Sequence, residues 1–285
     1  MKNLTNLLLA WMAALSAVYA QDDLKIDTIF SEYTTAHGHS FIKIAYPTMS
    51  NEAFNKSMSS HIKSYIDEML GKSSIETLHG VTPSNKEEMK DYADTACQLL
   101  ATALGKEWEE DVLKNMGEEA EDSYYNDIIC EHNLDFYILN DMARYACVCV
   151  VNYGFYGGAH GFTGIFPLIV RKSDGDILSS PFKDDSLESL RQLLEKNMHK
   201  NDFGVLELAD IDSNDKKGKK EMAEMIREYG MFPEPQYAWT DGKQFFIQYQ
   251  QYEILPYAYG APVVVVPMDI IMPFLTDEVK DVLGL

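Results

Sequence analysis

The sequence predicts an α+β protein, because helical and strand patterns gather in different parts of the chain. Apolar residues recur at helical spacing in much of the first half, and they alternate with a period of two in much of the second half. Patterns that separate in this way are typical of α+β folds rather than of alternating β-α units. We expect two small domains, residues 21–129 and 130–285, each with an antiparallel sheet and packed helices.

The first twenty residues have the pattern of a secretory signal peptide. Lys2 precedes an apolar run that ends near Val18, and Ala20 stands at the expected cleavage site. The run is shorter than the roughly 20 apolar residues of a membrane span, and no cysteine follows the cleavage site to carry a lipid. We therefore expect residues 1–20 to be removed and the mature chain to be secreted, in a periplasm or outside the cell, without a transmembrane anchor.

The chain is strongly acidic, with 24 basic and 45 acidic side chains and a formal net charge of −21. Removal of the signal peptide takes away only Lys2, which makes the net charge −22. This charge argues against nucleic acid as a partner, because it repels a phosphate backbone. It speeds encounter with basic proteins, although solubility alone is the simpler explanation.

Four cysteines in a secreted chain permit disulfides in three complete pairings: Cys97, Cys130, Cys147 and Cys149. Cys147 and Cys149 lie two residues apart in a strand pattern, which puts their Cα atoms about 6.6 Å apart, at the limit of disulfide geometry. We expect these two not to pair, and we expect each cysteine to be a small buried apolar side chain. The sequence leaves the disulfide state and the oligomeric state open.

In the first half, residues 40–46 alternate as a strand that Pro47 ends, and two helices follow. Ser50 is the expected cap of the first helix, and Gly71 closes it. Its apolar face carries Phe54, Met58, Ile62, Ile66 and Met69. The second helix begins at Ser84, with Glu87 completing a capping box, and Gly105 ends or interrupts it. It should bury Met89, Tyr92, Ala96, Leu99, Leu100 and Ala103.

The second half reads as a series of strands with two helices. The predicted strands are residues 134–138, 144–153, 165–170, 236–239, 244–249 and 263–266. The helices begin at Asp185 and at Pro267. The acids at 173–176 are a turn signal, and the strand at 263–266 is apolar enough to be buried on both faces. The acidic stretch 109–127 is interpreted as a solvated face.

The most distinctive segment, residues 153–161, is an aromatic strand that runs into paired glycines and a histidine. Adjacent glycines indicate backbone that adopts positive φ or approaches another surface closely. Tyrosine offers a large contact area with a polar tip, so the loop is a candidate site for a protein or a glycan. The candidate binding residues are Tyr156, Gly157, Gly158, His160, Phe162, Glu253, Tyr257 and Tyr259. The alternative is that the same aromatics fill the core.

Four features in one order resemble the secreted domain-of-unknown-function family 3298. They are the motif ending at His160, residues 177–182 with the helix after them, residues 246–249, and residues 252–267. The similarity covers roughly residues 130–275, and the strand and helix before it resemble, more weakly, the companion family 4163.

This resemblance implies domains that act near the cell wall, like the extracellular part of lysozyme-sensing anti-sigma factors. It therefore implies lysozyme or a peptidoglycan fragment as the partner of a non-catalytic binding protein. No catalytic residue is carried over, because the shared part is not the catalytic part of the related enzymes, and we expect no cofactor and no bound metal.

Two alternatives remain open. The first is a hydrolase with His160 as general base and Glu253 or Asp176 as its partner, since an accessible histidine titrates near neutral pH. The second is a calcium site in the loop from Asp210 to Glu221, where acids stand at the spacing of an EF-hand loop. Asp215 occupies the place of the glycine that such a loop needs, and four lysines crowd it.

Overall fold

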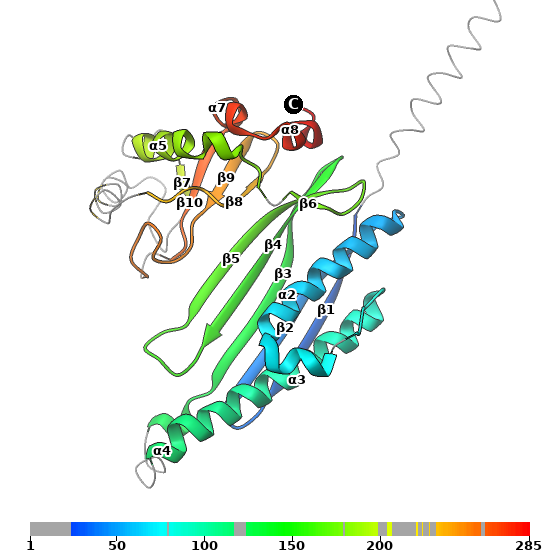
Figure 1. Ribbon diagram of the computed structural model, residues 1–285, viewed down its shortest axis with the longest axis vertical. Helices are drawn as coiled ribbons and strands as arrows, with labels where there is room; N and C mark the ends of the chain where they lie inside the picture. The colour runs from blue at the N-terminus through cyan, green and yellow to red at the C-terminus, as the bar shows by residue number, and fades with distance from the viewer. Residues whose placement is uncertain are drawn as a thin grey trace, which may run out of the picture.

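The computed structural model describes residues 24–78, 80–116, 124–178, 180–198, 204–206, 221, 224, 228, 232–257 and 260–285. It confirms the α+β class, with a six-stranded sheet that carries two long helices on one face and a four-stranded sheet with shorter helices (Figure 1). Within these ranges no helix combines the length and the apolar character that a membrane span requires.

The six-stranded sheet has its strands in chain order. They are β1 (Lys25–Thr34), β2 (Gly38–Thr48), β3 (Cys130–Asp141), β4 (Tyr145–Phe155), β5 (Phe162–Arg171) and β6 (Ile177–Leu178). All neighbouring pairs are antiparallel except β2 and β3, which are parallel, so the expectation of a purely antiparallel sheet is wrong here. A parallel pair needs a long crossover, and the two long helices supply it.

The predicted domain boundary between residues 129 and 130 falls on this crossover. The β2–β3 pair runs from Gly38 opposite Cys130 to Ile44 opposite Phe136, so strands from both sides of the boundary share one sheet. They also share one core with the helices. Pairing between segments so distant in sequence leaves no trace in local periodicity.

Strand β1 is absent from the sequence-based prediction, and β2 extends past its predicted end at Pro47. Pro47 lies opposite Ile26, and Thr35 N–H donates to Gly38 O at the start of the same hairpin. Hydrogen-bonded and non-hydrogen-bonded pairs alternate along an antiparallel ladder, which makes Pro47–Ile26 a non-hydrogen-bonded pair. The proline therefore removes no β1–β2 hydrogen bond, and the strand continues through it.

The two long helices, α2 (Glu52–Leu78) and α3 (Lys86–Trp108), cover one face of this sheet. Asn51, one residue after the predicted Ser50, accepts from the first free N–H groups of α2, and Gly71 breaks that helix with a φ of 67°. Asn85 caps α3 one residue after the predicted Ser84, while Ser84 N–H donates back to Glu88. The cap is thus one residue later than predicted, and Glu88 bonds the N–H before the cap instead of the cap's own N–H, as it would in a capping box.

The predicted apolar face of each long helix is buried with two exceptions. Leu99 is only partly buried and Ala103 is exposed. The core between helices and sheet includes Ile42, Ile44, Phe54, Met58, Ile62, Ile66, Met89, Leu134 and Phe136. Gly105 lies inside α3 and does not end it. A Cβ at this position would lie 2.6 Å from Thr35 Oγ1, so the glycine lets the helix pack closely against the β1–β2 hairpin.

The second sheet has the order β7-β10-β9-β8 and is antiparallel. Its strands are β7 (Gly204–Leu206), β8 (Tyr237–Thr240), β9 (Gln244–Gln248) and β10 (Val263–Pro267). The predicted β8–β9 hairpin is confirmed. β10 is central, and Val264, Val265 and Val266 are buried, as the apolar run predicts. The helices beside this sheet are α5 (Leu187–Met198), α7 (Met268–Ile271) and α8 (Asp277–Leu283).

Short helical segments complete the described structure: η1 (Glu109–Leu113), α4 (Lys114–Met116), η3 (Tyr124–Asp127), η4 (Asp184–Ser186) and η6 (Met272–Phe274). The two sheets meet where Cys147 and Ile169 of the first pack into the core formed by the second. All four cysteines are buried, as expected, and none of them is in a disulfide. Burial raises the pKa of the Cys97 and Cys147 thiols to about 12, so both stay protonated.

Candidate functional site

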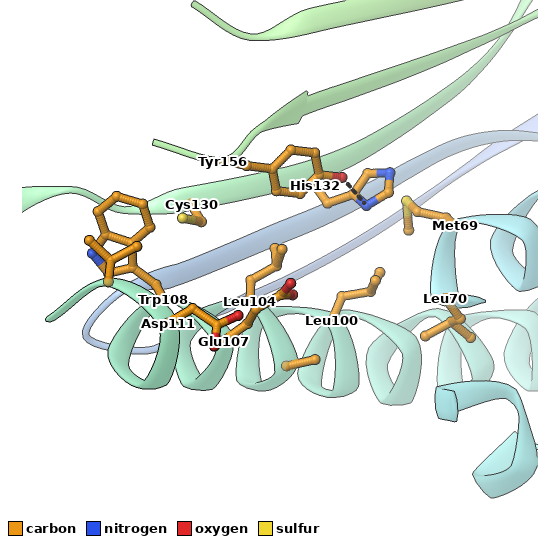
Figure 2. Close-up of a pocket in the computed structure, with 12 residues that line it drawn as sticks. Met69, Leu70, Leu100, Leu104, Glu107, Trp108, Asp111, Cys130, His132 and Tyr156 are labelled. Carbon is orange, nitrogen blue, oxygen red and sulfur yellow. Dashed lines mark hydrogen bonds between the residues drawn. The ribbon is translucent and has the colours of Figure 1, made fainter. Parts of the chain in front are cut away.

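A cavity of about 510 Å³ lies between the C-terminal part of α3 and the ends of β3 and β4, and we call it the α3 groove (Figure 2). Its apolar floor comes from successive turns of α3 and from the end of the first segment of α2. The groove is lined by Met69, Leu70, Leu100, Ala103, Leu104, Glu107, Trp108, Asp111, Val112, Cys130, His132 and Tyr156. A concave apolar site with a few convergent polar groups is the usual form of a binding site.

The groove wall includes a π-helix, η1, which continues α3 and carries Asp111 and Val112. Single π-turns inside helices are rare and frequently occur at functional sites. Glu107 and Asp111 are four residues apart, and both carboxylates lie at the groove (Figure 2). Neither forms an ion pair with another described residue, whereas Glu110 on the same segment lies 3.9 Å from Lys106.

His132 links the two strands at the back of the groove. Its Nε2 lies 2.8 Å from Asn152 Oδ1, and its Nδ1 lies 3.2 Å from the hydroxyl of Tyr156. Burial lowers the pKa of His132 below its ordinary value, although the bond to Asn152 opposes this shift. The neutral ring fits both contacts, since Nε2–H donates to Asn152 and Nδ1 accepts from the tyrosine.

Trp108 explains the first of the paired glycines. Gly157 has a φ of 78°, and a Cβ built there would lie 2.2 Å from the indole ring of Trp108. Trp108 in turn donates from Nε1 to Tyr125 O over 3.2 Å. Gly157 thus shows both features predicted for the glycine motif, a positive φ and a close approach to another surface. Gly158 has neither a positive φ nor a close neighbour.

The predicted binding residues separate into two groups. Tyr156 and Phe162 are half exposed with ring centroids 5.9 Å apart, and Tyr156 lines the α3 groove. His160 instead stacks on Tyr257 at 3.8 Å between centroids, and its Nε2 lies 3.2 Å from the hydroxyl of Tyr252. We call His160, Tyr252 and Tyr257 the histidine–tyrosine stack.

The two groups lie on opposite sides of the β4–β5 hairpin. Phe162 packs over Gly154, on the face that carries the helices. Tyr257 lies close enough to Tyr153 to raise the pKa of that tyrosine, although burial is the larger cause. Tyr153 and Gly154 are neighbours along β4, so their side chains point to opposite faces. Tyr259 lies outside the described residues.

Glu253 has a local structural contact. Its Oε2 accepts from Gln250 N–H over 2.5 Å. The Gln250 side-chain amide in turn bonds both the N–H and the C=O of Ile165, in place of a neighbouring strand along β5. Glu253 thus supports the loop that holds the histidine–tyrosine stack against the first sheet.

The two alternative sites gain no support from these contacts. His160 bonds Gly161 O and Tyr252, while Asp176 pairs with Arg171. The predicted calcium loop lies outside the described residues except for Glu221. In the described part of the chain, no group of three or more histidine, cysteine or acidic side chains is placed to hold a metal ion.

Sequence reasoning named Tyr156 but missed the other polar groups of the groove. Asp111 belongs to the acidic run 109–127 that was interpreted as a solvated face, Glu107 lies just before that run, and His132 lies just before the predicted strand 134–138. The four-residue spacing of the two acids beside Trp108 was the available signal, because residues at that spacing share one side of a helix.

Comparison with known proteins places one family on the second half of the chain. Residues 179–269 match the family described as a protein of unknown function, DUF3298, so a DUF3298 domain is present there. The match begins after the glycine motif. No curated protein matches the chain in sequence.

Two solved structures of DUF3298 proteins are similar to the whole chain. One, from Bacteroides fragilis NCTC 9343, has a TM-score of 0.64 and 18% identity, and the similarity covers 93% of this chain and 97% of that one. The other, from Pseudomonas aeruginosa PAO1, has a TM-score of 0.54 and 12% identity, with 91% and 97% covered. At such identities the similarity shows a shared fold. The companion family 4163 stays a prediction.

Proposed function

We propose that this protein is a non-catalytic binding protein that takes a lysine- or arginine-bearing segment of a basic protein into the α3 groove. The observation that carries the proposal is the combination of an apolar floor with the carboxylates of Glu107 and Asp111, neither of which is ion-paired within the described structure. A cationic side chain is itself an apolar stem with a charged end.

The groove matches that shape. The stem of a lysine or arginine would pack on Leu100, Leu104 and the ring of Trp108, and its cation would meet Glu107 and Asp111. The exposed ring of Tyr156 adds a cation–π contact at the same place. Glu107 and Asp111 are both exposed, so a cation from solution can reach either carboxylate, and salt should weaken the attraction.

The rest of the chain also favours a basic partner. A net charge of −21 speeds the approach of a basic protein, and the signal-like N-terminus is typical of a secreted protein. Together with the resemblance to lysozyme-sensing domains, these features lead us to propose a lysozyme-like protein of the cell envelope environment as the partner.

Titration calorimetry with a basic lysozyme tests this function. We expect binding that weakens at raised salt, and we expect weaker binding when the lysines of the lysozyme are acetylated, with any remaining affinity due to its arginines. Muropeptides serve as the second ligand in the same experiment. Absence of lysozyme binding at low salt would overturn the proposal, and binding of muropeptides alone would move the function to glycan recognition.

Charge-removing variants locate the site. Glu107→Gln with Asp111→Asn should weaken binding by at least about tenfold, since it removes both groove carboxylates. Glu109→Gln with Glu110→Gln makes the same change of net charge on residues that do not line the groove, and it should change affinity by less than about twofold. Equal losses in both variants would mean that only the general field of the protein acts.

The histidine–tyrosine stack supports a second candidate, binding of a peptidoglycan fragment. Its exposed Tyr252 has a φ of 66°, an uncommon conformation for tyrosine, and aromatic faces of this kind pack against sugar rings. Tyr252→Ala should abolish muropeptide binding and leave lysozyme binding unchanged, which separates the two candidates.

A further inference from the structure

Strand β1 is the outermost strand of the six-stranded sheet, and its far edge has no strand partner among the described residues. It pairs with β2 over its whole length, from Lys25 opposite Thr48 to Thr34 opposite His39, without a shift of register. It therefore presents a long, regular edge. Proteins usually interrupt such an edge with proline, a bulge or a short strand, because it offers a template for another chain.

The backbone groups on this edge belong to the even-numbered residues. Thr35 N–H donates to Gly38 O, so the odd-numbered residues of β1 make the ladder bonds to β2. The N–H and C=O groups of Ile26, Thr28 and Phe30 consequently point away from the sheet. Each lacks a ladder partner within the described structure.

The side chains beside these groups include exposed apolar ones. Ile26 is 50% exposed, Phe30 is 49% exposed and Tyr33 is 39% exposed. Phe30 is positioned by Phe41 of β2, with the ring centroids 6.2 Å apart. A second strand added at this edge would cover one flank of each of these side chains, and burial of apolar surface is the main favourable term in association.

Lys25 and nearby Lys86 offset the charges of Asp27 and Glu32 along β1. Asp27 pairs with Lys86 at 3.0 Å, and Glu32 Oε1 lies 3.1 Å from His39 Nε2, a contact that is an ion pair only when the histidine is protonated. Lys25 is the remaining charged residue of the strand. Unlike the rest of this acidic chain, the edge neither attracts a strongly basic partner nor repels a second acidic molecule.

We propose that two copies of this chain join through β1, as antiparallel neighbours about a two-fold axis perpendicular to the sheet. Such an axis keeps the helices of both copies on the same face and lets each strand supply the same surface to the other. The two sheets then become one continuous sheet.

Side-chain alternation and charge restrict the register, and a centre at Ile29 satisfies both. Opposite residues must have the same parity, because odd-numbered residues share the face that carries the helices. A centre at Ile29 pairs residues 25–33 of one copy with 33–25 of the other, and it places Thr28 opposite Phe30 and Lys25 opposite Tyr33. No like charges face each other in this arrangement.

Light scattering after size exclusion, with sedimentation at several concentrations, tests the dimer on the mature chain. Thr28→Pro removes an outward N–H without touching a β1–β2 bond, so it should give a folded monomer. Thr28→Val keeps the N–H and is the matched control, which should remain dimeric. Phe30→Asp, an independent variant, should also give a monomer by placing a charge in the apolar part of the edge.

Circular dichroism and thermal unfolding report whether each variant is folded. A wild-type chain that stays monomeric at about 100 μM, or a folded Thr28→Pro protein that still dimerises, would overturn the proposal. If Thr28→Pro does not fold, Phe30→Asp decides: a folded dimer contradicts the proposal, and a folded monomer supports it.

Discussion

The α3 groove and the β1 edge belong to the same sheet-and-helix layer, yet they differ in what they offer a partner. The groove combines an apolar floor with the carboxylates of Glu107 and Asp111, which have no ion-pair partner in the described chain. The edge offers unpaired backbone groups beside exposed Ile26 and Phe30, with Asp27 paired to Lys86 and Glu32 hydrogen-bonded to His39. The difference teaches that one acidic protein can present one surface suited to a basic molecule and another suited to its own copy.

Gly157→Val should have the largest effect. Of the two surfaces, it should disturb the α3 groove and leave the β1 edge intact. The side chain would enter the ring of Trp108 at a position with a φ of 78°, so we expect a loss of about 2 to 4 kcal/mol in the free energy of unfolding. Urea denaturation measures this loss. Gly158→Val, where the nearest atom to an added Cβ is His160 O at 4.0 Å, should cost less than about 1 kcal/mol.

The same Gly157→Val protein should lose lysozyme binding and keep the β1 dimer, provided that it is studied below its unfolding transition. Loss of both properties in a protein that circular dichroism shows to be folded would mean that the two surfaces are coupled. That result would contradict the expectation that the α3 groove and the β1 edge act independently.

Salt should act on the two surfaces in opposite directions. Raising the ionic strength from about 50 mM to about 300 mM should weaken lysozyme binding on the order of tenfold, because it screens attraction between opposite charges. The β1 dimer should be unchanged or slightly tighter, since salt screens the repulsion between two molecules of net charge −21. Calorimetry and sedimentation at both salt concentrations measure the two responses.

A smaller effect is expected from pH, through His132 at the back of the groove. Its pKa is lowered from 6.5 in the folded protein, mainly by burial, so the unfolded chain binds more protons as the pH falls. The neutral histidine's contribution is fully present above about pH 6.5 and is lost progressively as the pH falls toward the folded-state pKa. Thermal unfolding between about pH 7.5 and pH 5 should show a decrease in stability.

His132→Gln should reduce that decrease, because glutamine does not titrate and can still bond Asn152. The His61→Gln variant is the comparison, since burial also lowers the pKa of His61, which is remote from the groove. Each variant should flatten part of the pH dependence. If stability depends on pH in His132→Gln as it does in the wild-type protein, His132 does not contribute to the loss of stability in acid.

Local patterns in the sequence predicted those parts of the fold that depend on neighbours along the chain. The helix faces around Met58 and Ile62, the β8–β9 hairpin and the buried strand at 263–266 all follow from periodicity and turn chemistry. Strand β1 was missed, because only Ile29 and Ser31 in it are buried and its apolar residues do not alternate cleanly. An edge strand has little burial to leave a pattern.

The candidate site was predicted only in part, because local sequence patterns do not show which distant residues meet. The glycine motif was recognised, and Gly157 behaves as its chemistry requires. That Tyr156 and His160 belong to different sides of one hairpin could not be read from their spacing, because the turn between them decides which face each side chain reaches. Trp108 and His132 came from other elements, and sequence alone does not bring them together.

The sequence by itself determined the α+β class, the acidic charge, the periodic helices and the glycines, since each depends on side-chain chemistry and local backbone preference. Only the tertiary structure decided that β2 pairs with β3 across the long helical crossover, that Glu107 and Asp111 line a groove, and that β1 is left at an open edge. These features are contacts between distant segments, and their free energy comes from burial that no single segment possesses.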